Sequence, residues 1–310
     1  MKGKILIVDD LHPVFKERAI AQGFEVDDFP TITRQETLDS IANYTGIAVR
    51  TKFRIDEELF KAAPNLKFVA RAGAGLDNID EAYAAAHNIH LMNAPEGNCD
   101  AVGEHAIGML LSLANNFRQA DQQIRQGIWD REGNRGWELK GKTVGIIGYG
   151  FMGSSFARKL AGFGVKVIAY DKYKTGFSDA YATEVSMEEI VKHSDVLSLH
   201  IPLTAETRQM VDDEYFFHFK KPIFFISTAR GEVTSTKAVL NAIESGKIMG
   251  AALDVLEVEK FPKLVEQAWY PALVNSGKVL LSPHVAGWTF DSYRKISEVL
   301  AEKLQALPII

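Results

Sequence analysis

Cysteine is scarce in this chain of 310 residues, in which Cys99 stands alone. A single thiol excludes an internal disulfide framework and cannot supply a cysteine zinc site, so we expect no metal centre and a reducing compartment. We expect Cys99 to be a small buried apolar residue rather than a nucleophile.

Runs of lysine or arginine are also missing, and the formal net charge is -5 with a pI near 5.9. A net negative charge argues against nucleic acid and acidic membranes as partners. Long hydrophobic runs are absent too, because the first apolar stretch reaches Asp9 too soon for a signal peptide or a membrane span. These absences favour a cytoplasmic protein whose partner is a small molecule.

What the sequence does contain is a repeated alternation of short apolar strands with helical segments, without hairpin signals. Such alternation predicts parallel sheets covered by helices, in an α/β fold. One series runs to about residue 95, and a second series of six strands begins at Lys142. Between them we expect one long helix from about Cys99 to Gln126.

The stretch VGIIGYGFMG at 144–153 carries the pattern G-x-G-x-x-G between a strand and a helix. Its glycines allow the backbone to approach a pyrophosphate, whose charge is favoured at the N-terminus of the following helix. Asp171 ends the next strand, about 20 residues further on, where a carboxylate binds the adenosine ribose and repels a 2′-phosphate. The motif predicts a dinucleotide site that prefers NAD to NADP, although Lys172 and Lys174 act against that preference.

The position of this motif predicts two doubly wound parallel-sheet domains. The segment after His284 is too short for a domain, so we expect it to pack on the N-terminal one. Residues 1–95 and 286–310 would form a discontinuous, flavodoxin-like substrate domain. Residues 96–285 would form a Rossmann NAD-binding domain inserted into it.

Polar residues follow several strands of the second series, where the ligand of an open parallel sheet binds. They are His200, Arg230, the acids Asp254, Glu257 and Glu259, and His284. An arginine, a carboxylate and a histidine beside a nicotinamide would suit hydride transfer to a keto acid. Arginine binds a carboxylate through two hydrogen bonds, and a protonated histidine donates to the carbonyl oxygen. Spacing alone does not choose between the two histidines or among the three acids.

Seven ordered stretches resemble the D-isomer-specific 2-hydroxyacid dehydrogenase family and span nearly the whole chain. They are RAGAGLDNID (71–80), NAPEGN (93–98), GIIGYGFMG (145–153), HIPLTAET (200–207), STARG (227–231), AALDVLEVE (251–259) and SPHVAGWT (282–289). The resemblance implies that His284 is the acid–base and that Glu259, rather than Glu257, raises its pKa. It also implies that Arg230 binds the carboxylate and carbonyl of the substrate.

The same resemblance implies the contacts of the NAD cofactor. Asp254 is expected at the nicotinamide ring, and His200 on the adenine side rather than at the reacting atoms. The other expected cofactor contacts are Ala74, Gly148, Gly150, Phe151, Met152, Gly153, Asp171, Ile201, Pro202, Thr228, Ala229, Ala286 and Gly287. The turn Gly73-Ala74-Gly75 is expected to offer N–H groups to the substrate.

The stretches AVRTKFR (48–54) and VARAGAG (69–75) resemble those of D-3-phosphoglycerate dehydrogenases, here without the C-terminal regulatory domain that many of these enzymes have. Arg50 and Arg71 would then hold a phosphate while Arg230 holds the carboxylate, which implies the 3-phosphoglycerate/3-phosphohydroxypyruvate couple of serine biosynthesis. The alternatives are a glyoxylate or hydroxypyruvate reductase and an NAD-sensing, corepressor-like binding protein.

Three features depart from the family pattern: Lys260 after the acid, a longer loop before His284, and Trp288 where a small residue is common. Trp288 either narrows the substrate site or packs at the domain seam. The long central helix carries more apolar surface than one domain covers, which predicts a homodimer with this helix at the interface. Trp129 and Trp137 are expected to pack or to lie at the same interface.

Overall fold

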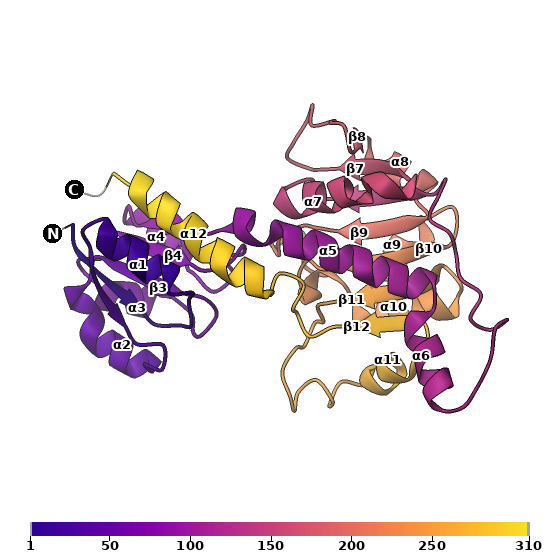
Figure 1. Cartoon of the computed structure of the whole chain (residues 1–310), viewed down its shortest axis with the longest axis horizontal. Coiled ribbons are helices and arrows are strands. Elements are labelled where there is room, and N and C mark those ends of the chain that lie inside the picture. The colour runs from indigo at the N-terminus through magenta and orange to yellow at the C-terminus, as the bar shows by residue number, and fades with distance from the viewer. Residues whose placement is uncertain (1, 309–310) are drawn as a thin grey trace. The chain divides into compact units, whose positions relative to one another are not determined.

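The computed structural model describes residues 2–308, and the chain divides into two units. Unit 1 consists of residues 1–99 and 288–310, and unit 2 of residues 100–287. The boundaries therefore fall within a few residues of the positions 95 and 286 expected from the sequence. In Figure 1 the indigo N-terminal segment and the yellow C-terminal helix belong to the same unit.

A five-stranded parallel sheet with the order β2-β1-β3-β4-β5 forms the centre of unit 1. Its strands are β1 (Lys4–Ile7), β2 (Glu25–Asp28), β3 (Gly46–Val49), β4 (Phe68–Arg71) and β5 (His90–Met92). This is the flavodoxin-like order, and the direction of strand addition reverses between β1 and β3. Ligands of such sheets bind at the carboxyl ends of the strands beside the reversal.

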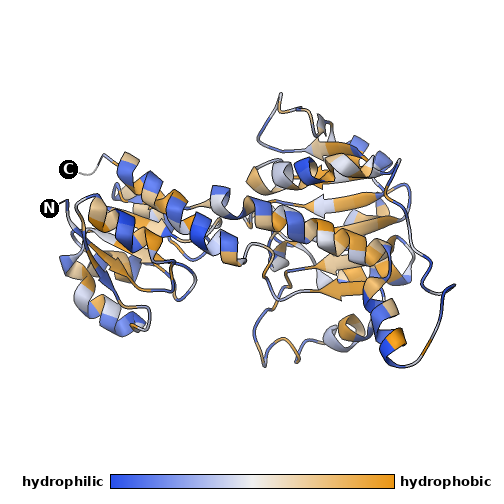
Figure 2. Ribbon diagram, in the orientation of Figure 1, coloured by the Kyte–Doolittle hydropathy of each residue, from blue (hydrophilic) through white to orange (hydrophobic). Residues whose placement is uncertain are grey.

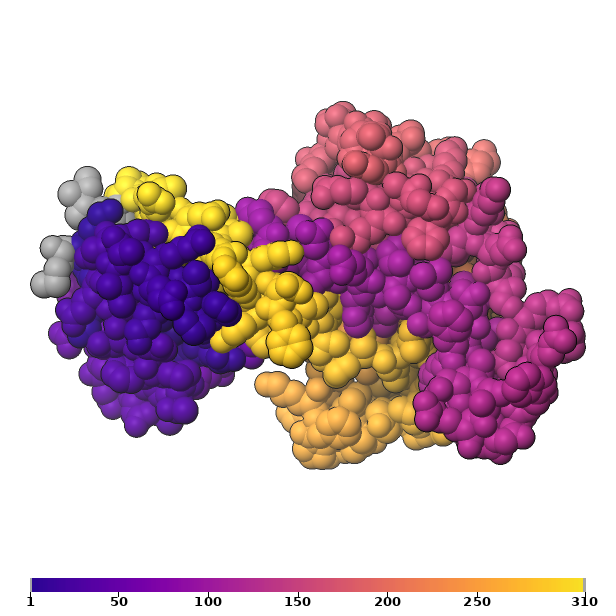
Figure 3. Space-filling view, in the orientation of Figure 1, coloured from indigo at the N-terminus to yellow at the C-terminus, as the bar shows by residue number. Residues whose placement is uncertain are grey.

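Three helices of unit 1 begin at side chains that suit a helix N-terminus. Thr33, Asp56 and Asp80 each accept a hydrogen bond from the first turn of the helix that follows. The helices are α1 (Val14–Ala21), α2 (Arg34–Ser40), α3 (Glu57–Ala62), α4 (Glu81–Ala86) and α12 (Phe290–Ala306), with the short 3₁₀ turn η1 (Ile41–Asn43). Helix α12 buries its apolar side in the core of unit 1 and packs on α1, and Figure 3 shows the yellow C-terminal segment beside the indigo N-terminal one.

A seven-stranded parallel sheet with the order β12-β11-β10-β9-β6-β7-β8 forms the centre of unit 2. Its strands are β6 (Thr143–Ile147), β7 (Lys166–Tyr170), β8 (Thr183–Glu184), β9 (Val196–Leu199), β10 (Ile223–Ser227), β11 (Ile248–Leu253) and β12 (Val279–Leu281). The sequence predicted six strands and missed β8. That strand is two residues long, lies at the sheet edge and has no buried residue, so it leaves no apolar run to recognise.

Helices cover both faces of this sheet, with one apolar cluster on each face. They are α5 (Pro95–Ala114), α7 (Phe151–Lys159), α8 (Met187–His193), α9 (Asp213–Phe217), α10 (Thr236–Glu244) and α11 (Tyr270–Asn275), with the 3₁₀ turns η2 (Leu160–Phe163) and η3 (Gly231–Val233). Figure 2 shows the strands as mainly hydrophobic and the helices as mixed. A parallel sheet buried on both faces requires this pattern.

The long helix predicted from Cys99 to Gln126 is wrong as one element. The structure has α5 (Pro95–Ala114) and α6 (Phe117–Arg125), separated where Asn116 adopts a left-handed conformation with φ 53°. Helix α5 buries apolar side chains in the core of unit 2, whereas α6 has no buried residue. Cys99 is half-buried near the start of α5, not buried as expected. None of the helices within residues 2–308 is both long and apolar enough to cross a membrane.

Candidate active site

The candidate residues of unit 2 all follow the carboxyl ends of parallel strands, and these ends meet at one edge of the sheet. Asp171 follows β7, His200 follows β9, and the loops that carry Arg230, Asp254 and His284 follow β10, β11 and β12. The strand order reverses between β6 and β9, so the glycine-rich turn after β6 lies at the reversal. This is the place where doubly wound sheets bind a nucleotide.

The three glycines of the G-x-G-x-x-G turn differ in what surrounds them. A Cβ on Gly148 would collide with the His200 carbonyl oxygen, and one on Gly153 would collide with the Gly148 carbonyl oxygen. A Cβ on Gly150 would meet nothing within 4 Å. Gly150 is the residue before α7, so open space lies at the N-terminus of that helix, beside Phe151 and Met152. An anionic group such as a pyrophosphate fits there.

Asp171 is held against the glycine-rich turn. Its carboxylate accepts hydrogen bonds from the main-chain N–H groups of Tyr149, at 2.8 Å, and Tyr173, at 3.0 Å. Asp171 also lines a hollow of about 620 Å³ with Tyr170, Lys172, Lys174, Thr175, Ser178, Glu184, Val185 and Ser186. A hollow of this size beside a carboxylate suits the adenosine end of a dinucleotide.

The two lysines after Asp171 are occupied by contacts within the chain. The Lys172 ammonium pairs with the Glu206 carboxylate, which raises the pKa of Lys172. Lys174 Nζ donates to the Tyr149 carbonyl oxygen at 3.1 Å. Because Glu206 neutralises the charge of Lys172, this lysine attracts the 2′-phosphate of NADP less strongly than its place beside Asp171 suggests. The preference for NAD is therefore weakened less than expected.

Two further residues expected at the cofactor have shielded polar atoms. Thr228 Oγ1 and His200 Nδ1 are shielded from solvent and have no hydrogen-bond partner within residues 2–308. His200 Nε2 lies 2.9 Å from Ser198 Oγ, and burial lowers the pKa of His200 to about 4. His200 is therefore neutral near pH 7 and is not a proton donor for a keto acid. The unsatisfied Thr228 hydroxyl fits a polar ligand group.

His284 and Glu259 form the central contact of the site. His284 Nδ1 lies 2.9 Å and 3.1 Å from the two Glu259 carboxylate oxygens. This hydrogen bond raises the pKa of His284, against the opposing effect of burial. Glu257 points elsewhere, because its carboxylate accepts from Thr236 N at 2.7 Å and from Gln209 Nε2 at 2.9 Å. Of the acids that the spacing left open, Glu259 is the partner of His284.

Arg230 lies near this pair, and its positive charge lowers the pKa of His284. Its Nη1 donates to the Ala229 carbonyl oxygen at 2.7 Å. The next residue must be glycine, because a Cβ on Gly231 would collide with the Leu256 carbonyl oxygen. The A-R-G motif thus permits the close approach between the Arg230 loop and the loop that leads to Glu259.

Asp254 is only 2% exposed, and its carboxylate is turned towards the segment that carries His284. It accepts hydrogen bonds from Ser282 Oγ at 2.5 Å, Val285 N at 3.0 Å and Ala286 N at 2.9 Å. The Asp254 carboxylate, which was expected at the nicotinamide ring, therefore also has a structural role, because it binds the backbone next to His284. Ser282 and the residue bound to it, His105 on α5, were not recognised from the sequence, because no motif links them.

In unit 1, the loop after β3 is held by a buried carboxylate. Asp9 accepts hydrogen bonds from the main-chain N–H groups of Arg50 (3.0 Å), Thr51 (2.8 Å) and Lys52 (2.9 Å). The Arg50 guanidinium lies over the Trp288 indole. Lys52 is turned away, since its Nζ donates to the Pro30 carbonyl oxygen at 2.7 Å.

The second expected arginine of unit 1, Arg71, is the last residue of the neighbouring strand β4. Arg71 lies so close to Gly73 that any Cβ at position 73 would collide with its guanidinium. Gly73 has φ 151°, and its carbonyl oxygen accepts from Ala94 N at 2.8 Å. Asn93 Nδ2 donates to the Ala74 carbonyl oxygen at 2.6 Å. The NAPEGN stretch therefore fixes the turn that ends at Gly75.

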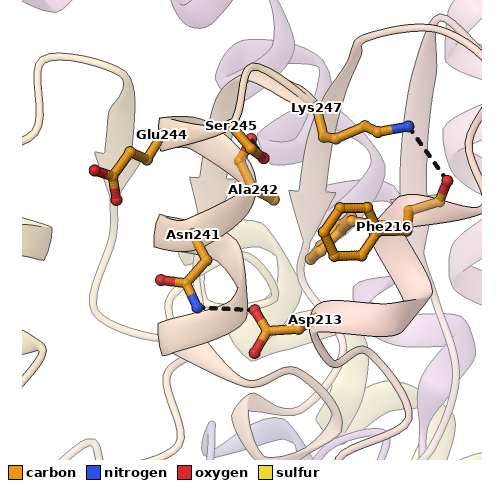
Figure 4. A pocket seen from close by; sticks show the side chains of 8 residues that line it. Asp213, Phe216, Asn241, Ala242, Glu244, Ser245 and Lys247 are labelled. Carbon is orange, nitrogen blue, oxygen red and sulfur yellow. Dashed lines mark hydrogen bonds between the residues drawn. The ribbon is translucent and has the colours of Figure 1, made fainter.

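A second hollow lies at the opposite edge of the unit 2 sheet, near the amino ends of β10 and β11 (Figure 4). It has a volume of about 400 Å³ and is lined by Asp213, Phe216, Phe217, Asn241, Ala242, Glu244, Ser245 and Lys247. Asn241 Nδ2 donates to Asp213 at 2.9 Å, and Lys247 Nζ donates to two carbonyl oxygens of the α9 end. These polar groups bind one another, so the hollow gives no sign of a ligand. Within residues 2–308, no group of three or more His, Cys, Asp or Glu side chains could hold a metal ion.

Comparison with known proteins identifies the family. Residues 107–286 match the model of the D-isomer specific 2-hydroxyacid dehydrogenase, NAD binding domain. The chain is 32% identical to a D-3-phosphoglycerate dehydrogenase of Archaeoglobus fulgidus over 97% of its own length and 56% of the relative's length. It is 33% identical to a hydroxypyruvate reductase of Thermotoga maritima over 88% of each protein.

A solved structure shows the same similarity. A D-lactate dehydrogenase from Aquifex aeolicus, complexed with NAD and lactic acid, superposes with a TM-score of 0.81 at 27% identity, over 98% of this chain and 94% of that one. The glycine-rich turn, the strand-end residues and these matches agree. The chain belongs to the D-isomer specific 2-hydroxyacid dehydrogenase family and is an NAD-dependent enzyme of that family.

Proposed function

We propose that the protein interconverts 3-phosphoglycerate and 3-phosphohydroxypyruvate, with His284 as the acid–base. The proposal depends above all on the contact between His284 and Glu259, which keeps the imidazole protonated at a higher pH than usual. A proton donor with a pKa near the working pH is what reduction of a keto acid requires.

The chain's own residues have separate roles in the reduction. A bound nicotinamide cofactor in its reduced form would supply a hydride for the keto carbon. His284 gives its proton to the carbonyl oxygen, so the products are the hydroxy acid, NAD and a neutral imidazole. Glu259 binds Nδ1, which leaves Nε2 to carry the transferred proton. Arg230 binds the substrate carboxylate and draws charge from the carbonyl.

The residues proposed to hold the cofactor are those that follow β6, β7 and β10. The N–H groups at the start of α7 would receive the pyrophosphate in the open space at Gly150. Asp171 would bind the adenosine ribose from the hollow that it lines. The unsatisfied Thr228 hydroxyl would bind a polar group of the nicotinamide end.

Phosphate recognition is assigned to Arg50 and Arg71. Arg50 follows β3 and Arg71 ends the paired strand β4, where Val49 and Arg71 are in register. The Asp9 carboxylate fixes the Arg50 main chain, so the guanidinium is presented from a rigid loop. A phosphate offers several acceptor oxygens, which suits two arginines from adjacent strands. The similarity to a D-3-phosphoglycerate dehydrogenase supports this assignment.

Reduction of an unphosphorylated acid is the second candidate function. The similarity to a hydroxypyruvate reductase, over a larger share of that relative's length, favours it. The Trp288 ring over Arg50 also favours it, since it already occupies one face of the guanidinium. In that case the enzyme is a glyoxylate or hydroxypyruvate reductase.

Steady-state reduction of a keto-acid panel with NADH tests these candidates. We expect kcat/KM for 3-phosphohydroxypyruvate to exceed the values for hydroxypyruvate and glyoxylate, and Arg50→Ala to remove most of the difference, about 30-fold for a charge-assisted contact of about 2 kcal/mol. His284→Asn should lower kcat at least ~100-fold with nearly unchanged NADH binding.

Each alternative gives a different result in the same panel. Equal or higher rates with the unphosphorylated acids would assign the protein as a reductase. No turnover of any member would favour a corepressor-like protein that senses NAD. The phosphoglycerate assignment also implies a role in serine biosynthesis, and that role fails if the phosphorylated substrate is rejected. The proposed cytoplasmic location does not depend on the substrate.

A further inference from the structure

A chain of hydrogen bonds joins helix α5 to the strand-end carboxylate behind the reacting groups. His105 Nε2 lies 2.9 Å from Ser282 Oγ, and Ser282 Oγ lies 2.5 Å from Asp254 Oδ1. All three residues belong to unit 2, and His105 is half-buried on α5. The proposed proton transfer uses neither His105 nor Ser282.

The chemistry of the three groups fixes the direction of these hydrogen bonds. A serine hydroxyl has one proton, and an ionised carboxylate can only accept. At 2.5 Å the hydroxyl must donate to Asp254, because otherwise two oxygen lone pairs would face each other. Ser282 Oγ therefore accepts from His105, whose Nε2 carries a proton. His105 is therefore the outermost donor in this series of hydrogen bonds.

The Asp254 carboxylate, at the inner end of this series of hydrogen bonds, holds the polypeptide backbone around His284. The Asp254 carboxylate accepts from Val285 N and Ala286 N, which follow His284, and from the Ser282 side chain, which precedes it. His284 N donates to the Asp254 carbonyl oxygen at 2.8 Å. Both sides of the histidine are thus attached to one buried residue.

This attachment matters because the His284 main chain is in an unfavourable conformation. Its φ is 54°, in the left-handed region that residues with a Cβ rarely adopt. Such a conformation persists only where the surroundings impose it. The conformation aims Nδ1 at the Glu259 carboxylate. A carboxylate that loses one of its donors would hold the segment less firmly and would loosen that contact.

We propose that His105 and Ser282 are positioning residues for His284, acting through Asp254. They keep the carboxylate oriented, and the carboxylate keeps the imidazole facing Glu259. The charged groups around His284 are Glu259, Arg230 and Asp254, and the proposed chain joins His105 to the last of them. The inference rests on the proposed role of His284, but its test includes a measurement that needs no turnover.

The variants are Ser282→Ala, His105→Leu and His105→Gln. In the first two, we expect kcat for the best keto acid to fall about 10-fold while the KM for NADH changes less than twofold, because misplacement affects the proton step rather than cofactor binding. The pKa of His284, followed by NMR titration of the protein without cofactor, should fall towards its ordinary value. His105→Gln should restore both values, since its amide can donate to Ser282.

Two controls separate positioning from general damage. His193→Leu removes an exposed histidine of α8 that pairs only with Glu189 in the described structure, and it should change neither value. Thermal unfolding shows whether each variant is folded; if Ser282→Ala is not, the comparison of His105→Leu with His105→Gln decides.

The outcomes are distinct from those that test the function itself. If kcat and the pKa of His284 stay unchanged in both Ser282→Ala and His105→Leu, the positioning role is wrong. The role is equally wrong if His105→Gln behaves like His105→Leu. If the natural protein turns over no keto acid, yet the pKa of His284 falls in the variants as expected, the proposed function fails and the hydrogen-bond chain stands.

Discussion

The Arg50 guanidinium lies over the Trp288 indole, 4.0 Å from the ring centroid. Trp288 is itself held edge-on by Tyr293 at 5.4 Å, and the Tyr293 hydroxyl donates to Asp10 at 2.7 Å. The sequence offered two roles for Trp288, a narrowed substrate site or packing at the domain seam. Within unit 1 its contact is with the arginine, which keeps its in-plane N–H groups for a ligand while one face is stacked.

Replacing Trp288 should therefore weaken selection of the phosphorylated substrate. A cation–π contact at a partly exposed site is worth about 0.5–1 kcal/mol, so we expect Trp288→Leu to reduce the ratio of kcat/KM for 3-phosphohydroxypyruvate over hydroxypyruvate about 2- to 5-fold. Phe290→Leu is the matched control, since Phe290 is 99% exposed. An unchanged ratio in Trp288→Leu would mean that the stacked arginine does not contact the phosphate.

Glu259→Gln should shift the pH dependence of the reduction to lower pH. Glu259 raises the pKa of His284, so protonated His284 persists to a higher pH than an ordinary histidine. Reduction needs the protonated form, and its rate falls as pH rises through this pKa. Without the carboxylate charge the pKa of His284 drops, so the rate of reduction begins to fall at a lower pH. The measurement is kcat/KM for the keto acid between pH 5 and 9, and a profile identical to that of the natural protein would contradict the pairing.

The oxidation direction supplies the complementary check. Oxidation of the hydroxy acid needs neutral His284, so its rate rises with pH through the same pKa. In Glu259→Gln this rise should also begin at lower pH. Glu257→Gln is the control, because Glu257 is bound to Thr236 and Gln209 rather than to His284.

The fold was predictable from the sequence wherever a short apolar run ended at a turn. Buried parallel strands are apolar on both faces, so their runs stand out, as in Ile223–Ser227, whose five residues are all buried. The edge strand Thr183–Glu184 buries nothing and left no such signal. The break between α5 and α6 was missed because Asn116 enters the left-handed region within an otherwise helical pattern.

The site was predictable to the extent that its residues follow strands. Arg230, Glu259 and His284 could be named because strand ends and motifs mark them. Ser282 and His105 could not, since they are 177 positions apart and meet only after the sheet has formed. The stacking of Trp288 on Arg50 was missed for the same reason.

Asp171→Ala combined with Glu206→Gln should make the enzyme accept NADPH. Removing the carboxylate abolishes its repulsion of a 2′-phosphate, and removing the Glu206 charge releases the Lys172 ammonium that it pairs with. We expect Asp171→Ala alone to erode the preference for NADH and the double variant to erode it further, measured as the ratio of kcat/KM for the two cofactors. Glu206→Gln alone should change the ratio little. A ratio equal in all four proteins would show that Asp171 does not face the ribose.

Two copies of the chain should associate through α6. Helix α6 buries none of its residues, and Phe117 and Ile124, 57% and 53% exposed, lie seven positions apart and therefore on the same side of the helix. Trp129, which is 80% exposed, follows shortly after. Apolar residues gathered in this way are uncommon on a surface that faces only water, and a second copy of the same chain is the partner that a symmetric dimer requires.

Light scattering at micromolar concentration should give twice the chain mass of 34.4 kDa. Ile124→Glu places a charge in the centre of the exposed apolar side and should shift the mass to that of a single chain, because an unpaired charge in an apolar interface costs more than the contact gains. Ile20→Glu is the matched control, since Ile20 is similarly exposed on α1 of unit 1, where we expect no association. A single-chain mass for the natural protein would refute the dimer, and a dimer that persists in Ile124→Glu would place the interface on another surface.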